Sequence, residues 1–254
     1  MDGLLITILI VTGFLVYKMI SSSRKQEGYK RWKATGSGDT ANEETAGNKW
    51  KHGAWLRHAL GVTTPKARTY PVFDEEAVVW CAGLLGVEAV RLKEILQDVS
   101  SHYREFWIRK RKGGYRMISA PDKELKSIQD TIYHRILLPV NVHPVATGFR
   151  RQHSIVDNVR PHLGKRCVLK TDIHDFFLSI RSPRVKQTFE NIGYPKNISK
   201  VLGELCCRRR HLPQGASTSP ALSNIIAYEM DRKLAVMAEE FGLAYTRYAD
   251  DLTF

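Results

Sequence analysis

The chain opens with an apolar run at residues 3–17, which continues past Lys18 through Met19 and Ile20. At roughly 18 residues, this run reaches the lower length limit for a helix that crosses a bilayer. We therefore expect residues 1–20 to form a transmembrane anchor. The Lys and Arg residues nearby follow the run, which predicts a single-pass protein whose remaining chain is cytoplasmic. The alternative is an apolar helix buried in the fold or in an oligomer.

Two segments of different pattern separate this run from residue 101. Residues 21–50 are rich in Ser, Gly, Thr, Lys, Glu and Asn and have almost no aliphatic pattern, which predicts a flexible linker. From Trp55 to Val99, apolar positions recur at helical spacing, and the acidic residues from Asp74 onward suit a helix start. We expect residues 51–100 to form a helical N-terminal extension of the domain that follows.

Beyond residue 100, strand-like and helical patterns are mixed. Residues 103–108 and 115–118 alternate around Gly113 and Gly114, which predicts a β-hairpin. Helical periodicity follows over residues 123–140, 183–207 (with a break at 193–195) and 220–241. Ser219 is the candidate N-cap of the last helix, and Pro220 suits its first turn. The mixture predicts an α/β fold.

Acidic side chains interrupt two of the strand-like segments. Asp250 and Asp251 lie between the apolar runs 243–247 and 252–254, as at the turn of a hairpin, and Asp172 ends the run 168–172. An Asp-Asp pair alone is most often a solvated turn. Three carboxylates from two strands instead suit a pair of Mg²⁺ ions, the arrangement used for in-line nucleotidyl transfer.

Positive charge is concentrated in one part of the chain. The net charge is +13, and residues 101–170 contain fifteen Lys and Arg against five Asp and Glu. A solvated face normally mixes signs, so this block, which includes Lys110, Arg111 and Lys112, indicates a nucleic-acid footprint. The four cysteines show no zinc-ligand spacing, and we expect them to be reduced and buried.

Three motifs appear in an order that resembles the palm of a reverse transcriptase. The first is Asp172 with Phe177 five residues later; the second is Leu-Pro-Gln-Gly-Ala-Ser-Thr-Ser-Pro at residues 212–220; the third is Tyr-Ala-Asp-Asp at residues 248–251. Within that family, residues 115–121 with 125–129, and 148–150 with 154–156, resemble the first two motifs of bacterial retron-type enzymes. Asn158 and His162 lie where those enzymes carry Asn-Ala-x-x-His, with Val159 in place of the Ala. The resemblance covers roughly residues 100–254.

The resemblance implies a right-hand polymerase fold. Residues 101–254 would form the fingers and a palm with a ferredoxin-like βαββαβ sheet. The later family motifs and the α-helical thumb are absent from the sequence. The chain is then a fragment of a longer protein, a subunit that needs a partner chain, or a fold retained without activity.

The resemblance also implies roles for individual residues. Asp172, Asp250 and Asp251 would be catalytic and would hold two Mg²⁺ ions. Phe177 would exclude a ribose 2′-hydroxyl, although only one of the pair Phe176 and Phe177 can face the site in a strand, and either could be core. The remaining candidates are Arg116 for the triphosphate, Gln214 and Gly215 for template or nucleotide, and Asn158 and His162 for RNA recognition. The ordinary alternatives are an exposed strand arginine at Arg116 and a structural histidine at His162.

The function implied by the resemblance is RNA-directed DNA synthesis from dNTPs. A structured noncoding RNA would supply template and priming site, an RNA–DNA molecule would be the product, and the role would lie in anti-phage defence. The location at the cytoplasmic face of the inner membrane is predicted separately, from the apolar N-terminal run and the basic residues after it. The sequence does not identify an effector protein. Alternatives are a group II intron-like or other defence-associated reverse transcriptase, or a non-catalytic, membrane-tethered RNA-binding module.

Overall fold

The computed structural model describes residues 72–110 and 113–254, and these residues belong to one compact unit. The predicted anchor (1–20), the predicted linker (21–50) and the first part of the predicted extension (51–71) lie outside the described residues, as do Arg111 and Lys112. Within the described ranges, no helix is both long and apolar enough to cross a membrane.

Two helices begin the described part of the chain. Helix α3 (Glu75–Leu85) starts after Asp74, whose carboxylate accepts a hydrogen bond from the Glu76 amide at 3.2 Å, and ends at Gly86, whose φ is 70°. Helix α4 (Ala89–Gln97) and a 3₁₀ turn, η1 (Val99–His102), follow. Both α-helices pack on α9 (Lys196–Leu205) and belong to the same compact unit as the rest of the described fold.

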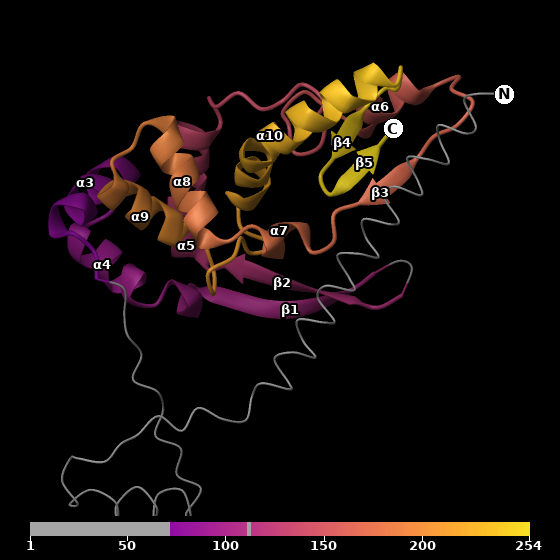
Figure 1. Ribbon diagram of the computed structural model, residues 1–254. Helices are drawn as coiled ribbons and strands as arrows, with labels where there is room; N and C mark the ends of the chain where they lie inside the picture. The colour runs from indigo at the N-terminus through magenta and orange to yellow at the C-terminus, as the bar shows by residue number, and fades with distance from the viewer. Residues whose placement is uncertain (1–71, 111–112) are drawn as a thin grey trace, which may run out of the picture. The chain divides into compact units, whose positions relative to one another are not determined.

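The predicted β-hairpin is confirmed. Strands β1 (Tyr103–Arg109) and β2 (Tyr115–Pro121) pair antiparallel, with Gly113 and Gly114 at positive φ in the turn. Side chains along most of its length are exposed, and only Tyr103 and Ser119, near its base, are buried. The hairpin therefore projects from the helices that hold its base (Figure 1).

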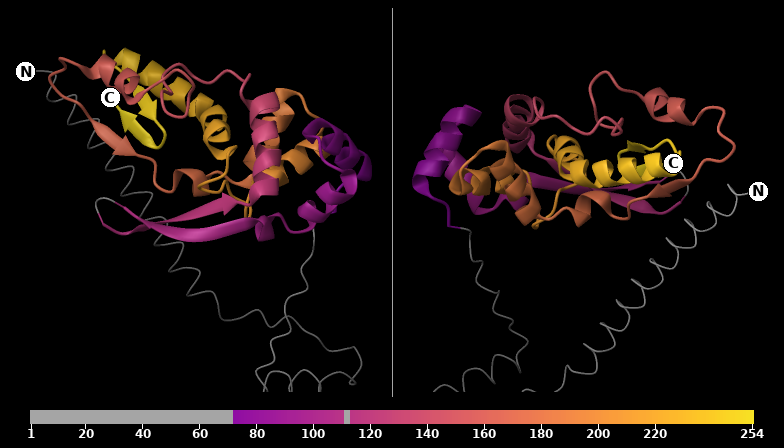
Figure 2. Two further views of the ribbon diagram at one scale, coloured as in Figure 1. Left: turned by 180° about the vertical axis from the view of Figure 1, so that it is seen from behind. Right: turned by 45° about the horizontal axis from the view of Figure 1, so that its top comes forward.

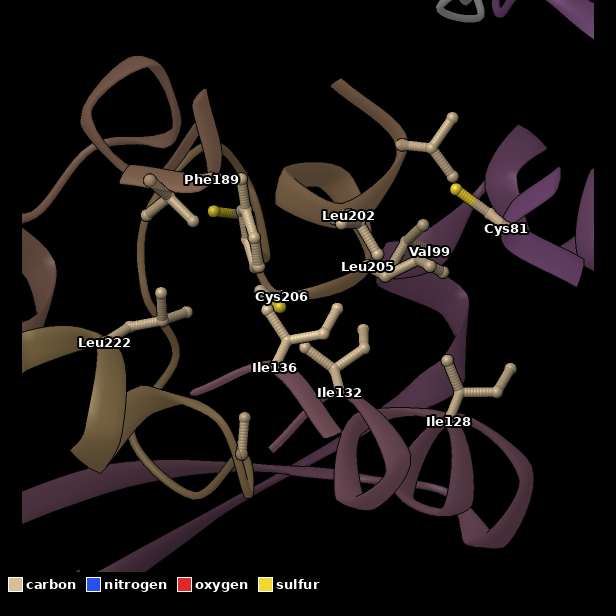
Figure 3. Packing of buried hydrophobic residues seen from close by; sticks show 14 of the residues in the cluster. Cys81, Val99, Ile128, Ile132, Ile136, Phe189, Leu202, Leu205, Cys206 and Leu222 are labelled. Carbon is tan, nitrogen blue, oxygen red and sulfur yellow. The ribbon is translucent and has the colours of Figure 1, made fainter. Parts of the chain in front are cut away.

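The main hydrophobic core lies among the helices at the hairpin base. Helix α5 (Lys123–Ile132) continues into a π-helical turn, η2 (Tyr133–Leu137), and α8 (Ser182–Ile192) ends at Gly193, where the sequence predicted a break. Figure 3 shows Ile128, Ile132, Leu202 and Leu205 directed toward one another in this core. Cys81, Cys206 and Cys207 are buried here as free thiols, whereas the prediction of burial is wrong for Cys167, which is exposed.

A small antiparallel sheet lies beside α10 (Ser219–Glu240), away from the main core (Figures 1 and 2). It consists of β3 (Lys170–Asp172), β4 (Thr246–Tyr248) and β5 (Asp251–Thr253) in the order β3-β5-β4. This arrangement corresponds to the β-α-β-β part of the predicted βαββαβ sheet; within the described residues, this sheet has no fourth strand. Of the remaining short helices, α6 (Ile155–Val159) and η3 (Arg160–His162) contact β4, whereas α7 (Phe176–Ser179) contributes Phe176 to the main core.

The N-cap prediction for the long helix is wrong by one residue. The cap is Thr218, and its side chain makes no capping hydrogen bond. The Ser219 hydroxyl instead donates to the Pro213 carbonyl at 2.7 Å, which fixes the preceding turn against the start of α10.

Candidate active site

Asp172 and Asp251 lie directly opposite each other on adjacent strands. They are paired positions of β3 and β5. Next to them, the Ile173 amide donates a hydrogen bond to the Asp250 carbonyl at 2.8 Å. This position in the ladder lies between two hydrogen-bonded pairs, where opposite side chains on one face come closest, with Cβ atoms about 4.5–5.5 Å apart. The fold therefore brings two carboxylates from segments far apart in sequence to one face of the sheet.

The third carboxylate belongs to the turn that joins β4 to β5. Ala249 adopts φ 59°, a left-handed conformation that is uncommon for a residue with a side chain, and Asp250 follows it and is exposed. The predicted hairpin with acids at its turn is thus present in the structure. Lys170, one position along the same face of β3, places its Nζ 3.0 Å from Oδ2 of Asp251 and offsets part of the negative charge.

The side chains at this end of the sheet suit a hard divalent cation. All three candidate ligands are carboxylates, the oxygen donors that Mg²⁺ prefers. In the described ranges, no three carboxylate, imidazole or thiol groups already converge closely enough to hold a metal ion. Asp172, Asp250 and Asp251 nevertheless fit the cation in chemical type, and they lie at the same end of the sheet. Asp172 and Asp251 are like charges opposite each other, so a bound cation would relieve their repulsion.

Phe177 lies on the short helix that follows Asp172. The expectation of strand alternation at Phe176 and Phe177 is wrong, because both belong to α7, a single turn that begins after Asp175 at φ 51°. Phe176 is buried in the main core, and Phe177 is half-buried with its ring centroid 5.9 Å from that of Phe149. Of the two rings, Phe177 is thus the one left partly open.

The turn at Gln214 and Gly215 packs against strand β2. The Gln214 carbonyl accepts from the Ser119 amide at 2.8 Å, and a β-carbon on Gly215 (φ 124°) would lie 2.9 Å from Ile118 Cγ2 and from the Ser119 carbonyl oxygen. Only glycine fits this approach. Arg116 lies two residues from Ile118 on β2 and is exposed. The Gln214–Gly215 turn is therefore packed on the same strand that carries Arg116, so the candidate nucleotide-binding residues belong to two connected elements.

Asn158 and His162 face the protein interior. Both are 7% exposed; His162 Nε2 lies 2.8 Å from the Thr246 hydroxyl, and Asn158 Oδ1 accepts from the Thr147 hydroxyl at 3.2 Å. Burial lowers the pKa of His162 below its ordinary value, as does the nearby Lys165. These contacts give both residues a structural role beside β4, and their role in RNA recognition remains a prediction. Of the three basic RNA-binding candidates, Lys110 is exposed, and Arg111 and Lys112 are outside the described residues.

Sequence reasoning missed a polar group beneath the acidic turn. Arg247 and Asp231 are fully buried and form an ion pair at 2.7 Å, and Asn224 bonds to both Arg247 and the Gly148 carbonyl. A signal was available: Arg247 stands within an apolar strand-like run, and Asp231 lies on the apolar face of α10, four residues after Ala227. Charged residues at two such positions are typical of a buried pair.

Comparison with known proteins agrees with this geometry. Residues 108–254 match the family model for reverse transcriptase (RNA-dependent DNA polymerase). The chain belongs to the reverse transcriptase family. Within that family it is similar to retron enzymes, as predicted: it is 38% identical to the Retron Ec86 reverse transcriptase of Escherichia coli over 171 residues, covering 66% of this chain and 53% of that protein. It is 32% identical to the Retron Mx162 reverse transcriptase of Myxococcus xanthus over 254 residues, covering 91% and 51%.

The similarity to reverse transcriptases covers only part of the length of those proteins. The chain spans about half the length of the curated relatives it matches. The family match begins within β1 and includes β2, the helices that follow and all three strands of the acidic sheet. The shared part is thus the part that contains the candidate site.

Proposed function

We propose that this chain carries the fingers and palm of a retron-type RNA-directed DNA polymerase. The observation that supports the proposal most directly is the register that places Asp172 opposite Asp251, with Asp250 in the adjoining turn. Two or three carboxylates at one end of a sheet are costly unless a cation compensates their charge. The similarity to a retron reverse transcriptase indicates the reaction that such a site would serve, which is RNA-directed DNA synthesis.

The three carboxylates would hold two Mg²⁺ ions, which in their bound state would activate the primer 3′-hydroxyl and neutralise charge on the triphosphate. Around them, the chain's own residues would select and orient the nucleotide. Phe177, half-buried on the short helix that follows Asp172, would exclude a 2′-hydroxyl by its bulk. Arg116, exposed on β2, would bind the triphosphate through its guanidinium group.

The template we propose is a structured noncoding RNA that also provides the priming site, with dNTPs as substrates and an RNA–DNA molecule as product. The excess of Lys and Arg over residues 101–170 supports binding to a polyanion. A role in anti-phage defence is part of this proposal and rests on the retron relationship alone.

Template-directed incorporation by the protein from the complete gene tests the function. The assay uses an RNA template with an annealed primer, all four dNTPs and Mg²⁺, with an Asp172, Asp250 and Asp251→Asn triple variant as the matched control. We expect extended products that require Mg²⁺ and are absent with the triple variant. If the parent extends no primer but still binds RNA, the non-catalytic RNA-binding module becomes the better description.

We also propose that residues 1–20 anchor the protein in the inner membrane with its catalytic domain in the cytoplasm. The support is the apolar run at residues 3–17 and the basic residues that follow it. A reporter fused after residue 35 should sediment with membranes and resist alkaline carbonate extraction. The matched control is the same fusion without residues 1–20, which should be soluble; solubility of both would contradict the anchor.

A further inference from the structure

A buried ionic cluster lies beneath the turn that carries Asp250. Arg247 on β4 and Asp231 on α10 are both fully inaccessible to solvent. The pair is bidentate: Arg247 Nε donates to Asp231 Oδ1 at 2.8 Å, and Nη2 donates to Oδ2 at 2.7 Å. The Tyr245 hydroxyl donates to Oδ1 of the same carboxylate at 2.9 Å. The Asp231 carboxylate thus accepts three hydrogen bonds, and the two from Arg247 fix the plane of the guanidinium group.

The remaining nitrogen of the guanidinium group reaches the turn itself. Arg247 Nη1 donates to the backbone carbonyl of Ala249 at 2.9 Å and to the Asn224 side-chain oxygen at 3.0 Å. Ala249 is the residue with φ 59° that immediately precedes Asp250. Its carbonyl belongs to the peptide plane that bears the Asp250 amide, so this hydrogen bond fixes the plane from which the Asp250 side chain departs.

The simplest alternative is that the cluster only attaches α10 to the sheet. Packing alone does not require ions, because buried ion pairs replaced together by apolar residues are often neutral for stability. Attachment also requires only the Asp231 contact, whereas the bond to the Ala249 carbonyl serves the turn. A lysine ammonium has no planar set of donors that could hold Asp231 and the turn at once.

We propose that Arg247, oriented by Asp231, is a positioning residue that holds the 249–250 turn so that Asp250 and Asp251 share one metal site. This inference rests on the proposed function, since it assigns a role to the metal-binding acids. It adds to that function a fixed internal support for the site, built from side chains that touch neither substrate nor metal.

The test separates support of the turn from general stability. The first variant, Arg247→Met with Asp231→Leu, removes both charges together, and the second, Arg247→Lys, keeps a positive charge but loses the planar donors. The matched control is Arg232→Met with Glu229→Leu, which removes an exposed ion pair on the same helix. For each we would measure the melting temperature, Mn²⁺ affinity by electron paramagnetic resonance, and kcat and KM for dNTP in primer extension.

We expect both Arg247 variants to bind Mn²⁺ about tenfold or more weakly, a change of about 1.4 kcal/mol. Their kcat should fall with little change in KM for dNTP, and the Arg232 control should behave like the parent. Mn²⁺ affinity within twofold of the parent in either folded variant would overturn the inference, and Arg247→Lys decides alone if the double variant does not fold. A parent that binds no Mn²⁺ would contradict the proposed function and the inference with it, whereas an active parent with unaffected variants contradicts only the inference.

Discussion

Gly148 lies directly against the backbone of Ala249: a β-carbon at position 148 would stand 2.5 Å from the Ala249 amide nitrogen. The adjoining segment is hydrogen-bonded to β4, since the Thr147 amide donates to the Arg247 carbonyl at 2.8 Å and the Arg247 amide donates to the Val145 carbonyl at 2.8 Å. The acidic turn is therefore enclosed by Gly148 and supported by the Arg247 side chain. A side chain at position 148 would have to displace backbone atoms.

Gly148→Ala should therefore distort the turn. We expect a loss of about 1–3 kcal/mol in the free energy of unfolding, the usual cost of overpacking, and a marked fall in primer-extension activity. Gly83→Ala is the matched control, because Gly83 is exposed within α3 and an added β-carbon there would meet nothing within 4 Å. The control should gain up to about 1 kcal/mol through helix propensity. Chemical denaturation and primer extension on both variants measure these effects; parental activity in Gly148→Ala would contradict the contact.

Loss of any one of the three acids should abolish synthesis. Asp172→Asn, Asp250→Asn and Asp251→Asn each remove a metal-binding charge, and RNA affinity should persist because it depends on phosphate contacts elsewhere. Asp172→Asn should also raise the metal-free stability by about 0.2–1 kcal/mol, since it relieves repulsion with Asp251. Primer extension, gel shift and metal-free melting decide these points. Near-normal extension by the Asp250 variant would remove the turn from the active site.

Phe177→Val should weaken sugar discrimination. The smaller side chain leaves room for a 2′-hydroxyl. The ratio of kcat/KM for rNTP to kcat/KM for dNTP should therefore increase by roughly tenfold or more relative to the parent. Leu178→Ala, an exposed neighbour on the same helical turn, controls for disturbance of α7. An unchanged ratio in an active Phe177 variant would assign the selection to another residue.

Stability should decline in mild acid through His162. Its folded-state pKa is lowered from 6.5 by burial, so the unfolded chain takes up the proton at higher pH than the folded protein. Stability from the neutral imidazole is therefore present above about pH 6.5 and falls below it, by at most about 1.4 kcal/mol per pH unit. In melting curves from pH 7.5 to 5, His162→Asn should show a shallower decline than the parent. The exposed His153→Asn variant should follow the parent curve, and a parental slope in His162→Asn would contradict the assignment.

Affinity for RNA should fall steeply with salt. Several phosphate contacts predict a log–log slope of about −4 or steeper, and replacing Lys110, Arg111 and Lys112 with Gln should flatten it by about 2–3 units for any RNA sequence. The control replaces Lys93, Lys186 and Lys233, which lie outside this block and form ion pairs within the protein, and should leave the slope nearly unchanged. Filter binding at several salt concentrations measures both slopes. If both sets of substitutions flatten the salt dependence equally, the effect reflects net charge in general, and the basic block is not the RNA-binding surface.

The sequence predicted the elements whose pattern is local. The hairpin at β1 and β2, the break at Gly193 and the strand that ends at Asp172 all follow from periodicity and turn residues. The Phe176 and Phe177 pair was misread because an apolar run of this length fits a strand as well as a helix. In the structure, a helical turn begins after Asp175, which adopts a left-handed conformation that its residue type does not dictate.

The support of the site depends on contacts between distant segments. Arg247 and Asp231 are 16 residues apart, and Gly148 approaches Ala249 from 101 residues earlier in the chain. Asn158 and His162 read as recognition residues in sequence, but the fold turns them toward Thr147 and Thr246. Periodicity can place a side chain on a face of an element, and it does not determine which other element covers that face.

The base of the β1–β2 hairpin has a mechanical consequence. Arg208 is buried there, pairs with Glu105 and lies 5.8 Å from the Tyr103 ring, while Ser119 is bonded to Gln214. The exposed outer part of the hairpin has no comparable attachment among the described residues. Among the described residues, the hairpin is therefore attached mainly near Ser119, and Arg116 lies beyond this attachment on β2. A bend of the hairpin about this base would therefore displace Arg116 relative to the Gln214 turn, which stays hydrogen-bonded to Ser119.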